Sequence, residues 1–187
     1  DPYLVTPEGT PSRGELIRQA LTCSNLEDWL EQLRHNAHWY AGFNLLVATP
    51  DTLWHMHRGR KKITLGRVSK GIHVLSNADL DTPWPKALNL QAAMQADRQI
   101  PQAHWPQGAL KAIQHSQEAP LETIPNTGIE PALEKKLSAA FIVGEDYGTR
   151  ATTWLTCHQG GSISITEQSF GPMAAPMGEV TLALETA

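Results

Sequence analysis

The chain has 187 residues, of which 41% are hydrophobic and 18% charged, and its formal net charge is −4. This composition is that of a soluble globular protein, and the length suits a single domain over residues 1–187. The lack of a basic excess argues against a nucleic-acid partner, and no apolar run in the sequence is long enough to span a membrane.

Cysteine usage and the start of the chain bound its location. Cys23 and Cys157 form no disulfide framework and show no metal-ligand spacing. Both lie among apolar residues, so we expect buried, reduced thiols in a cytoplasmic protein. No signal-peptide pattern is present. The chain opens at Asp1 without a Met, which indicates a processed product, a fragment or the ordered remainder of something longer.

Helix and strand patterns follow one another along the first half of the chain. Ser12 is a candidate N-cap for a helix that runs to about Thr22, with Glu15 at the capping-box position. Asn25 caps a second helix, which Gly42 ends. Short strands are then predicted over Phe43–Thr49, Leu53–His57, Ile63–Leu65 and Ile72–Leu75.

The second half of the chain predicts helices first and strands afterwards. The helices run from Trp84 to about Ala96, from Gln107 to about His115, and over Ala132–Leu137. The strands cover Ala151–Cys157, Ser162–Thr166 and Val180–Leu184, with a hairpin turn at residues 158–161. Two groups of antiparallel strands separated by helices predict a layered α+β fold.

Two histidines of a predicted strand are candidate metal ligands. His55 and His57 alternate along the strand and therefore share a face, and His73 could supply a third ligand. No Cys, Asp or Glu completes the set at a recognisable spacing, so surface or core histidines are the favoured interpretation and no metal site is predicted.

Basic residues gather on the hairpin that follows. Arg58, Arg60, Lys61, Lys62, Arg67 and Lys70 are six of the chain's 15 Lys and Arg residues. On a hairpin they could bind an anionic ligand such as a carboxylate, a phosphate or a haem propionate. The alternative is a solvated hairpin tip, which charge runs usually form.

Asn77 and Arg150 are candidate site residues because of where they stand in the pattern. Asn77 ends an apolar run, before a turn that Pro83 and Pro85 restrict, so its amide would be held rigidly at a sheet edge. An Asn after a strand also commonly makes only a local turn. Arg150 precedes a strand and could hold a carboxylate bidentately or polarise a nucleophile. A structural salt bridge with Glu145, Asp146 or Glu167 explains Arg150 equally well.

Short motifs follow one another over most of the chain, from about Ser12 to about Phe170. They are Ser12-Arg13-Gly14, Gly42-Phe43-Asn44-Leu45-Leu46-Val47, Leu75-Ser76-Asn77, Leu80-Asp81-Thr82-Pro83-Trp84-Pro85-Lys86, Leu137-Ser138, Phe141-Ile142 and Tyr147-Gly148-Thr149-Arg150. In this order they resemble the NRDE family, which includes transport and Golgi organisation proteins.

The resemblance implies an N-terminal-nucleophile hydrolase-like fold, a four-layer αββα sandwich. Family members begin with a Cys after the initiator Met, on the first strand, and nothing in this chain matches that part. We therefore expect the chain to be the larger, C-terminal part of the domain, with the N-terminal strands missing, and to be inactive alone. Neither Cys23 nor Cys157 can replace the nucleophile, because a mid-chain Cys has no α-amine to act as the base.

Two positions depart from the family pattern. Ile124-Pro125-Asn126-Thr127-Gly128 carries an Asn where the family has an Asp, so a carboxylate is lost. His57-Arg58 stands where the family often has Asn-Arg at the end of a strand.

The resemblance implies a hydrolase of C–N amide bonds or a carrier. In the hydrolase, Asn77 donates to the oxyanion and Arg150 stabilises the thiolate or the developing charge. In the alternative, a non-catalytic protein binds and traffics haem, lipid or acyl-CoA, and the basic hairpin of Arg58, Arg60, Lys61 and Lys62 receives its propionates or phosphates.

The predicted partner in either case is a small molecule: an amide, haem or acyl-CoA. No resident cofactor is predicted. Because the N-terminal strands are expected to be absent, we also expect an exposed apolar sheet face, which favours a homodimer or strand exchange.

Overall fold

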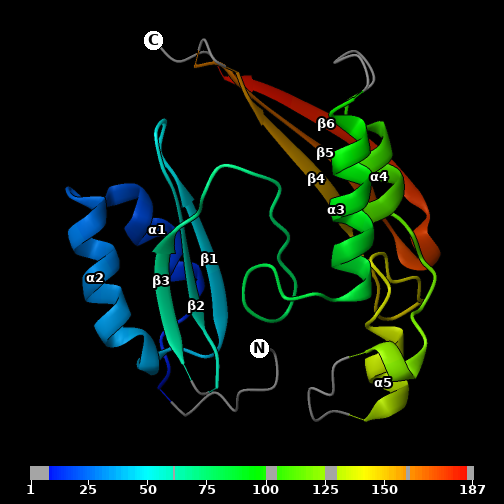
Figure 1. Cartoon of the computed structure of the whole chain (residues 1–187), viewed down its shortest axis with the longest axis horizontal. Helices are drawn as coiled ribbons and strands as arrows, with labels where there is room; N and C mark the ends of the chain where they lie inside the picture. The colour runs from blue at the N-terminus through cyan, green and yellow to red at the C-terminus, as the bar shows by residue number, and fades with distance from the viewer. Residues whose placement is uncertain (1–8, 61, 100–104, 125–129, 159–160, 185–187) are drawn as a thin grey trace. The chain divides into compact units, whose positions relative to one another are not determined.

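The computed structural model describes residues 9–60, 62–99, 105–124, 130–158 and 161–184. The chain divides into two compact units, residues 1–82 and residues 83–187, and each is described by itself (Figure 1). Within the described residues each unit combines helices with a three-stranded antiparallel sheet, so the predicted α+β class is confirmed.

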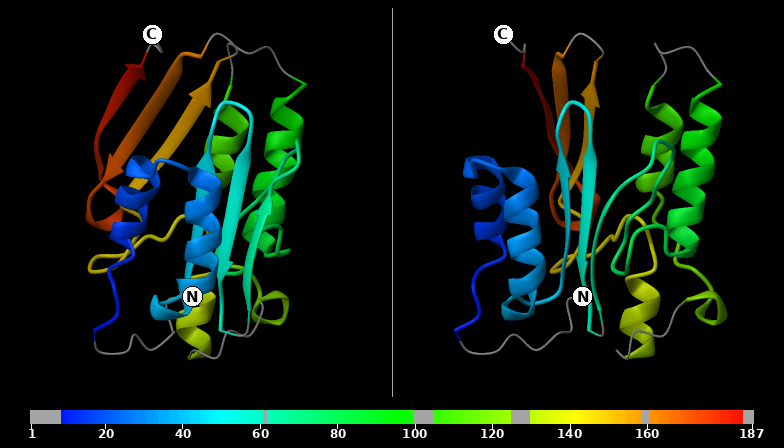
Figure 2. Two further views of the ribbon diagram at one scale, coloured as in Figure 1. Left: turned by 90° about the vertical axis from the view of Figure 1, so that its left-hand side faces the viewer. Right: turned by 60° about the vertical axis from the view of Figure 1, so that its left-hand side comes forward.

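The first unit places two helices before a three-stranded meander. Its elements are α1 (Gly14–Thr22), α2 (Leu26–Asn36), a 3₁₀ turn (Ala37–Trp39), β1 (Phe43–Ala48), β2 (Leu53–Arg58) and β3 (Ile63–Arg67). The strands pair in the order β1-β2-β3. The two helices cover one face of this sheet, and the loop that follows β3 passes over the other face (Figure 2).

Capping residues set the ends of these helices largely as the sequence predicts. The Asn25 side chain accepts hydrogen bonds from the backbone N–H groups of Glu27 and Asp28, at 3.0 and 3.2 Å, and so starts α2. Helix α1 starts later than predicted, and Ser12 lies outside it: its hydroxyl accepts from the Gly14 N–H at 3.3 Å and its carbonyl from the Glu15 N–H at 3.1 Å. A hydroxyl group two residues before the helix can still accept a hydrogen bond from one of the backbone N–H groups that lack a partner at the start of a helix.

Alternation along β1 decides what each face of the sheet presents. Phe43 and Leu45 point into a core that α1 and α2 complete, and Met56 of β2 joins it with no exposed surface. Asn44 lies between them in sequence and therefore points to the opposite face. The core is completed by Leu16, Leu30, Leu33, Ala37 and Tyr40. Because the side-chain period is 2, this apolar face fixes the register and with it the position of Asn44.

The strand predicted over Ile72–Leu75 is absent, and this prediction was wrong. The Val74 N–H donates to the carboxylate of Asp81 at 2.9 Å, and the Asp81 N–H donates to the Val74 carbonyl at 2.8 Å. His73 also contacts the Asp81 carboxylate, at 2.7 Å. The backbone groups of this apolar run are therefore satisfied across a loop rather than by a neighbouring strand.

The second unit places helices before a second three-stranded sheet. Its elements are α3 (Pro85–Asp97), α4 (Gln107–Ile113), a 3₁₀ turn (Leu121–Thr123), α5 (Pro131–Lys136), β4 (Ala151–Cys157), β5 (Ile163–Phe170), a 3₁₀ turn (Pro172–Ala174) and β6 (Pro176–Leu184). The strands pair in the order β4-β5-β6. Pro85 occupies the first helical position of α3, where a missing N–H costs nothing.

Buried polar contacts tie the helices of this unit together. The Asp97 carboxylate, which is 7% exposed, accepts the backbone N–H of Ala109 at 2.8 Å and so caps the start of α4. Gln114, just after α4, donates to Gln168 of β5 at 2.6 Å. These contacts hold α4 beside both α3 and the sheet.

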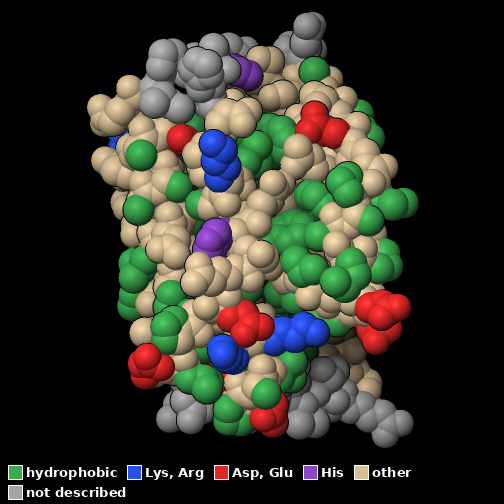
Figure 3. All heavy atoms as spheres, turned by 90° about the vertical axis from the view of Figure 1, so that its right-hand side faces the viewer, with side chains coloured by type: hydrophobic (Ala, Val, Ile, Leu, Met, Phe, Trp, Pro, Cys, Tyr) green, Lys and Arg blue, Asp and Glu red, His purple; other side chains and the backbone are tan. Residues whose placement is uncertain are grey.

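One face of the β4-β5-β6 sheet is apolar and exposed, as expected from the sequence. Leu155, Ile165 and Leu182 stand opposite one another in the register, and Leu155 and Leu182 are 57% and 59% exposed. Val180 and Leu184 share this face and are also exposed. Figure 3 shows that hydrophobic side chains also reach the surface on the side of the molecule drawn there, among polar and charged ones. Whether this face pairs with a second copy stays a prediction.

The cysteines are free, but the prediction that both are buried was wrong. Cys157 is exposed at the end of β4, because it lies on the same open sheet face as Leu155. Cys23 is partly buried, and its thiol donates to the Ala20 carbonyl at 3.3 Å. Across the part of the chain that the structure describes, no helix is long and apolar enough to cross a membrane.

Candidate functional site

A buried polar cluster lies on the face of the first sheet that the helices leave uncovered. Asn44 Oδ1 lies 3.0 Å from His55 Nε2 and 2.9 Å from His57 Nδ1. Both imidazoles are 6% exposed. The two rings come from alternate positions of β2, so they share a face as the sequence predicts. Asn44, one strand away, binds both.

The orientation of the Asn44 amide determines which imidazole nitrogens carry hydrogen. Asn44 Nδ2 donates to the Ala78 carbonyl at 2.9 Å and to the Ser76 carbonyl at 3.4 Å. Its oxygen must therefore face the rings, where it can only accept. His55 donates from Nε2 and His57 from Nδ1 as a result, which leaves the opposite nitrogen of each ring as the basic one.

Both rings are held in the neutral form. Burial lowers the pKa of His55, and this outweighs the attraction of the Asp79 carboxylate, whose oxygen is 3.8 Å from His55 Nδ1. Burial likewise lowers the pKa of His57. Neutral imidazoles of fixed tautomer can donate, accept or pass a proton without first losing one.

Asp79 and Lys62 form the exposed rim of the cluster. Lys62 Nζ lies 2.6 Å from Asp79 Oδ2. Burial opposes ionisation of Asp79, but hydrogen bonds from Lys62 and from the Leu80 N–H together hold its pKa below the ordinary value. The carboxylate therefore stays charged near neutral pH and partly neutralises the basic hairpin.

Asn77 lies between the two carbonyl groups that Asn44 binds. Its own side chain is exposed. Within the described part of the chain, the side-chain amide of Asn77 makes no hydrogen bond. The strand that was expected to hold Asn77 is absent. The Asn44 side chain instead binds the backbone carbonyl groups on either side of Asn77, those of Ser76 and Ala78.

The four basic residues of the predicted ligand site fall into different environments. Arg58 is partly buried, donates to the Gly59 carbonyl at 2.9 Å, and has a buried Nε with no hydrogen-bond partner in the described residues. Arg60 is exposed. Lys62 is paired with Asp79. Lys61 lies outside the described residues.

Arg67, a further basic residue of the hairpin, serves packing within the first unit. Arg67 binds Glu27 at 2.8 Å, and its guanidinium lies 5.0 Å from the centre of the Trp54 ring. These contacts attach β3 to α2. The number of basic residues on the hairpin is therefore larger than the number available to bind a ligand.

Arg150 is positioned by a tight loop in the second unit. The Thr149 N–H donates to the Ile142 carbonyl at 2.8 Å, and the Ile142 N–H donates to the Thr149 hydroxyl at 2.9 Å. The motifs Phe141-Ile142 and Tyr147-Gly148-Thr149-Arg150 are therefore paired in space.

The exposed guanidinium of Arg150 binds backbone rather than carboxylates. It donates to the Gly171 carbonyl at 3.3 Å and to the Glu145 carbonyl at 3.4 Å. Among the described residues it forms no ion pair with Glu145, Asp146 or Glu167, so the salt-bridge explanation of Arg150 was wrong. Arg150 belongs to the second unit and Asn77 to the first, and each is placed only within its own unit.

The histidines do not assemble a metal site in the described part of the chain. No group of three or more His, Cys, Asp or Glu side chains there could hold a metal ion. His73, the third candidate, binds Asp81 instead of joining His55 and His57. The Asn substitution predicted to remove a carboxylate, Asn126, lies outside the described residues.

Sequence reasoning missed Asn44 and Asp79. A signal for Asn44 was present, because a single polar residue interrupts the apolar strand Phe43–Ala48. Asp79 gave no local signal, since its partners Lys62 and His55 are far away along the chain.

Comparisons with known proteins identify related sequences over most of the chain. A sequence model of the family described as Transport and Golgi organisation 2 matches residues 4–172. Transport and Golgi organization protein 2 homolog of Bos taurus is 31% identical to this chain over 178 residues. The homologues of Mus musculus and Homo sapiens are both 28% identical over 173 residues.

These alignments cover 84% of this chain and 61% of each relative. The chain therefore spans about three fifths of the length of the curated relatives that it matches. Their names refer to transport and Golgi organisation, and mention no reaction or ligand.

Proposed function

Because this chain belongs to the Transport and Golgi organisation 2 family, we propose that the whole protein hydrolyses a C–N amide bond. Family membership and the two antiparallel sheets with flanking helices support this proposal. The fold that it requires is a four-layer αββα sandwich of the N-terminal-nucleophile type. The nucleophile would be an N-terminal Cys of the whole protein, which is not among the residues of this chain.

The observation that carries the proposal is the fixed position of Asn77. Two carbonyl groups beside it are bound by the partly buried Asn44, while its own amide is exposed and unpaired among the described residues. Because the backbone on either side of Asn77 is anchored before the substrate arrives, its amide needs less reorganisation when negative charge develops. An exposed amide on a fixed backbone has the properties of an oxyanion donor.

The reaction then follows the chemistry of an N-terminal thiol. The α-amine accepts the thiol proton, and the thiolate attacks the amide carbonyl to give a tetrahedral oxyanion. Asn77 donates a hydrogen bond to that oxyanion, and Arg150 stabilises the thiolate or the developing charge. The protonated α-amine returns its proton to the leaving nitrogen, so an amine departs. Water then hydrolyses the thioester to a carboxylic acid.

The test uses the whole protein with its N-terminal Cys exposed and a panel of N-acyl amino acids and acyl anilides. Amine release is measured for the wild type, a variant with that Cys replaced by Ala, Asn77→Ala, and Asn36→Ala as a control on α2. Asn77→Ala should lower kcat by about 10²–10³-fold with little change in KM, as loss of an oxyanion donor does. The proposal is lost if no N-terminal Cys exists or if the Cys variant stays fully active.

A second candidate function is the binding and trafficking of an anionic small molecule, such as haem or acyl-CoA. The observation that favours it is Arg58, which carries a buried Nε without a partner in the described residues. A guanidinium prefers to fill its donors with carboxylate or phosphate oxygens. Arg60, Lys61 and Lys62 extend the same hairpin and would add charge around such a group.

Haem titration and acyl-CoA binding separate this candidate from the hydrolase. Wild-type protein should show a saturable change in the haem absorption spectrum or saturable binding of palmitoyl-CoA. The combined Arg58→Ala, Arg60→Ala, Lys61→Ala and Lys62→Ala variant should bind at least about tenfold more weakly, because several charge-assisted hydrogen bonds are lost. Unchanged affinity in that variant would exclude the hairpin as the binding site.

A further inference from the structure

Lys86 is the second residue of α3, and its ammonium is directed inward. Its Nζ donates to the Leu137 carbonyl at 2.9 Å and lies 5.7 Å from the centre of the Trp84 ring. Burial lowers the pKa of this lysine. The contact to a carbonyl 51 residues away holds the amine at one place, rather than leaving it as a mobile surface charge.

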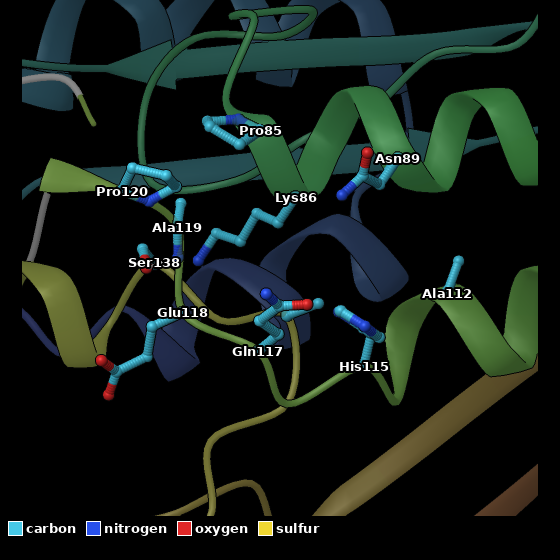
Figure 4. Close-up of a pocket in the computed structure, with 11 residues that line it drawn as sticks. Pro85, Lys86, Asn89, Ala112, His115, Gln117, Glu118, Ala119, Pro120 and Ser138 are labelled. Carbon is cyan, nitrogen blue, oxygen red and sulfur yellow. Dashed lines mark hydrogen bonds between the residues drawn. The ribbon is translucent and has the colours of Figure 1, made fainter. Parts of the chain in front are cut away.

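A cavity of about 220 Å³ opens beside this amine. Three segments of the second unit line it: the first turns of α3, residues 112–120, and the residues that follow α5. Figure 4 shows the Lys86 side chain extending from α3 toward Ala119 and Ser138, while His115 and Gln117 approach from the opposite wall. The cavity is thus lined by donors from both sides.

The cation in this cavity lacks an anionic partner among the described residues. Of the described residues that line the cavity, Glu118 is the one with a carboxylate, and its Oε2 lies 4.0 Å from Lys135 Nζ instead. In Figure 4 its carboxylate points away from the Lys86 amine. Removing an ammonium group from water is costly unless a charge or several acceptors replace the water.

Neighbouring groups are suited to complete an anion site rather than to neutralise Lys86 themselves. Ser138 is 4% exposed, and its hydroxyl is already used, since it accepts the Ala119 N–H and donates to the Lys135 carbonyl. These bonds fix the wall of the cavity. The exposed amide of Asn89 and the imidazole of His115 remain at its mouth, and both can donate to an oxygen.

We propose that this cavity binds a small anion, with its phosphate or carboxylate group on Lys86 and with Asn89 and His115 as further donors. The volume is below the range of drug-sized ligand pockets, about 300–1,000 Å³, and so suits a small anion or the end group of a larger molecule. The site lies wholly within the second unit and does not depend on the hydrolase reaction or on the basic hairpin.

The test is titration of the protein with inorganic phosphate, glycerol 3-phosphate and acetate in low-salt buffer. In protein labelled with ¹³C at the lysine ε-carbon, the Lys86 resonance should shift saturably and its pKa should rise, because a bound anion favours the charged amine. Phosphates that bind while acetate does not would identify a phosphate group as the ligand; the reverse would identify a carboxylate.

Matched variants locate the binding. Lys86→Met keeps the length of the side chain without the charge and should bind the anion at least about tenfold more weakly. Lys111→Met, on the exposed side of α4, should bind as the wild type does. The labelled wild type gives a result even if Lys86→Met fails to fold. A Lys86 resonance that no phosphate or carboxylate shifts, or equal affinity in a folded Lys86→Met variant, would overturn the proposal.

Discussion

The side-chain amide of Asn44 donates a hydrogen bond of 2.9 Å to the carbonyl oxygen of Ala78, 34 residues along the chain. Its oxygen at the same time accepts from His55 and His57. One side chain therefore joins β1, β2 and the loop that carries Asn77. Removing it would leave buried donors and an acceptor without partners.

Replacing Asn44 by Ala should destabilise the first unit strongly. We expect the free energy of unfolding to fall by about 2–4 kcal/mol, because two imidazole N–H groups and two carbonyl groups lose a partner in a largely buried network. Urea unfolding followed by tryptophan fluorescence measures the change. Asn36→Ala, at the exposed end of α2, should change it by less than about 0.5 kcal/mol. Equal stability of Asn44→Ala and the wild type would refute the role of this side chain.

The ion pair between His73 and Asp81 should give a stability contribution that depends on pH. The hydrogen bond to Asp81 raises the pKa of His73, so folding favours its charged form. The contribution is complete below the unfolded pKa of about 6.5 and is lost as the pH rises through the higher folded value. The hydrogen bond from His73 also opposes the effect of burial and holds the pKa of Asp81 low.

Comparison of His73→Asn with the wild type isolates this effect. The difference in the free energy of unfolding should be larger at pH 5.5 than at pH 8, by less than about 1 kcal/mol because the pair is partly exposed. His55 and His57 have the opposite sign, since their lowered pKa values make acidification unfavourable to the folded state. The contribution of His55 and His57 is the same in the wild type and in the His73→Asn variant, so it cancels in the difference between them. A difference that is independent of pH would contradict the prediction.

Gly144 should tolerate no side chain. A Cβ at this position would clash with the Tyr147 carbonyl oxygen, so the backbone of the loop before Arg150 would have to move. We expect Gly144→Ala to lower the free energy of unfolding by about 1–3 kcal/mol, the range for overpacking. Gly66→Ala is the control, because nothing lies within 4 Å of its Cβ. The measurement is the midpoint of thermal unfolding of both variants, and equal midpoints would argue against a rigid loop.

The apolar face of the β4-β5-β6 sheet should mediate self-association. Leu182 is 59% exposed there, so Leu182→Lys should leave the fold intact while placing a charge where two faces would meet. Sedimentation should show a wild-type dimer at micromolar concentrations and a shift to monomer in the variant. Leu88→Lys, at an exposed position of α3, should sediment as the wild type. A wild type that is monomeric at every concentration would remove the proposed dimer.

Local patterns predicted the elements that depend on neighbouring residues. The strand Ala151–Cys157 was predicted with its observed limits, because apolar and polar residues alternate along it. Asn25 was predicted as a cap because its partners, Glu27 and Asp28, follow directly. In both, the physical cause lies within a few residues.

Contacts between distant residues could not be predicted in the same way. The run Ile72–Leu75 has the composition of a strand, but its hydrogen bonds go to Asp81 across a loop. The position of Asn77 depends on Asn44, which lies on another strand. The resemblance indicated Asn77 and Arg150 as site residues, and their roles remain proposals.

The contact between Lys62 and Asp79 acts as an internal competitor for any anion that approaches the basic hairpin. The carboxylate belongs to the same unit and lies 2.6 Å from the ammonium, so its effective concentration there is on the order of millimolar or higher. A weak monovalent anion in solution would rarely displace it. A ligand with several negative charges can contact Arg58 and Arg60 before it replaces Asp79, so the hairpin should discriminate by valence rather than by charge sign alone.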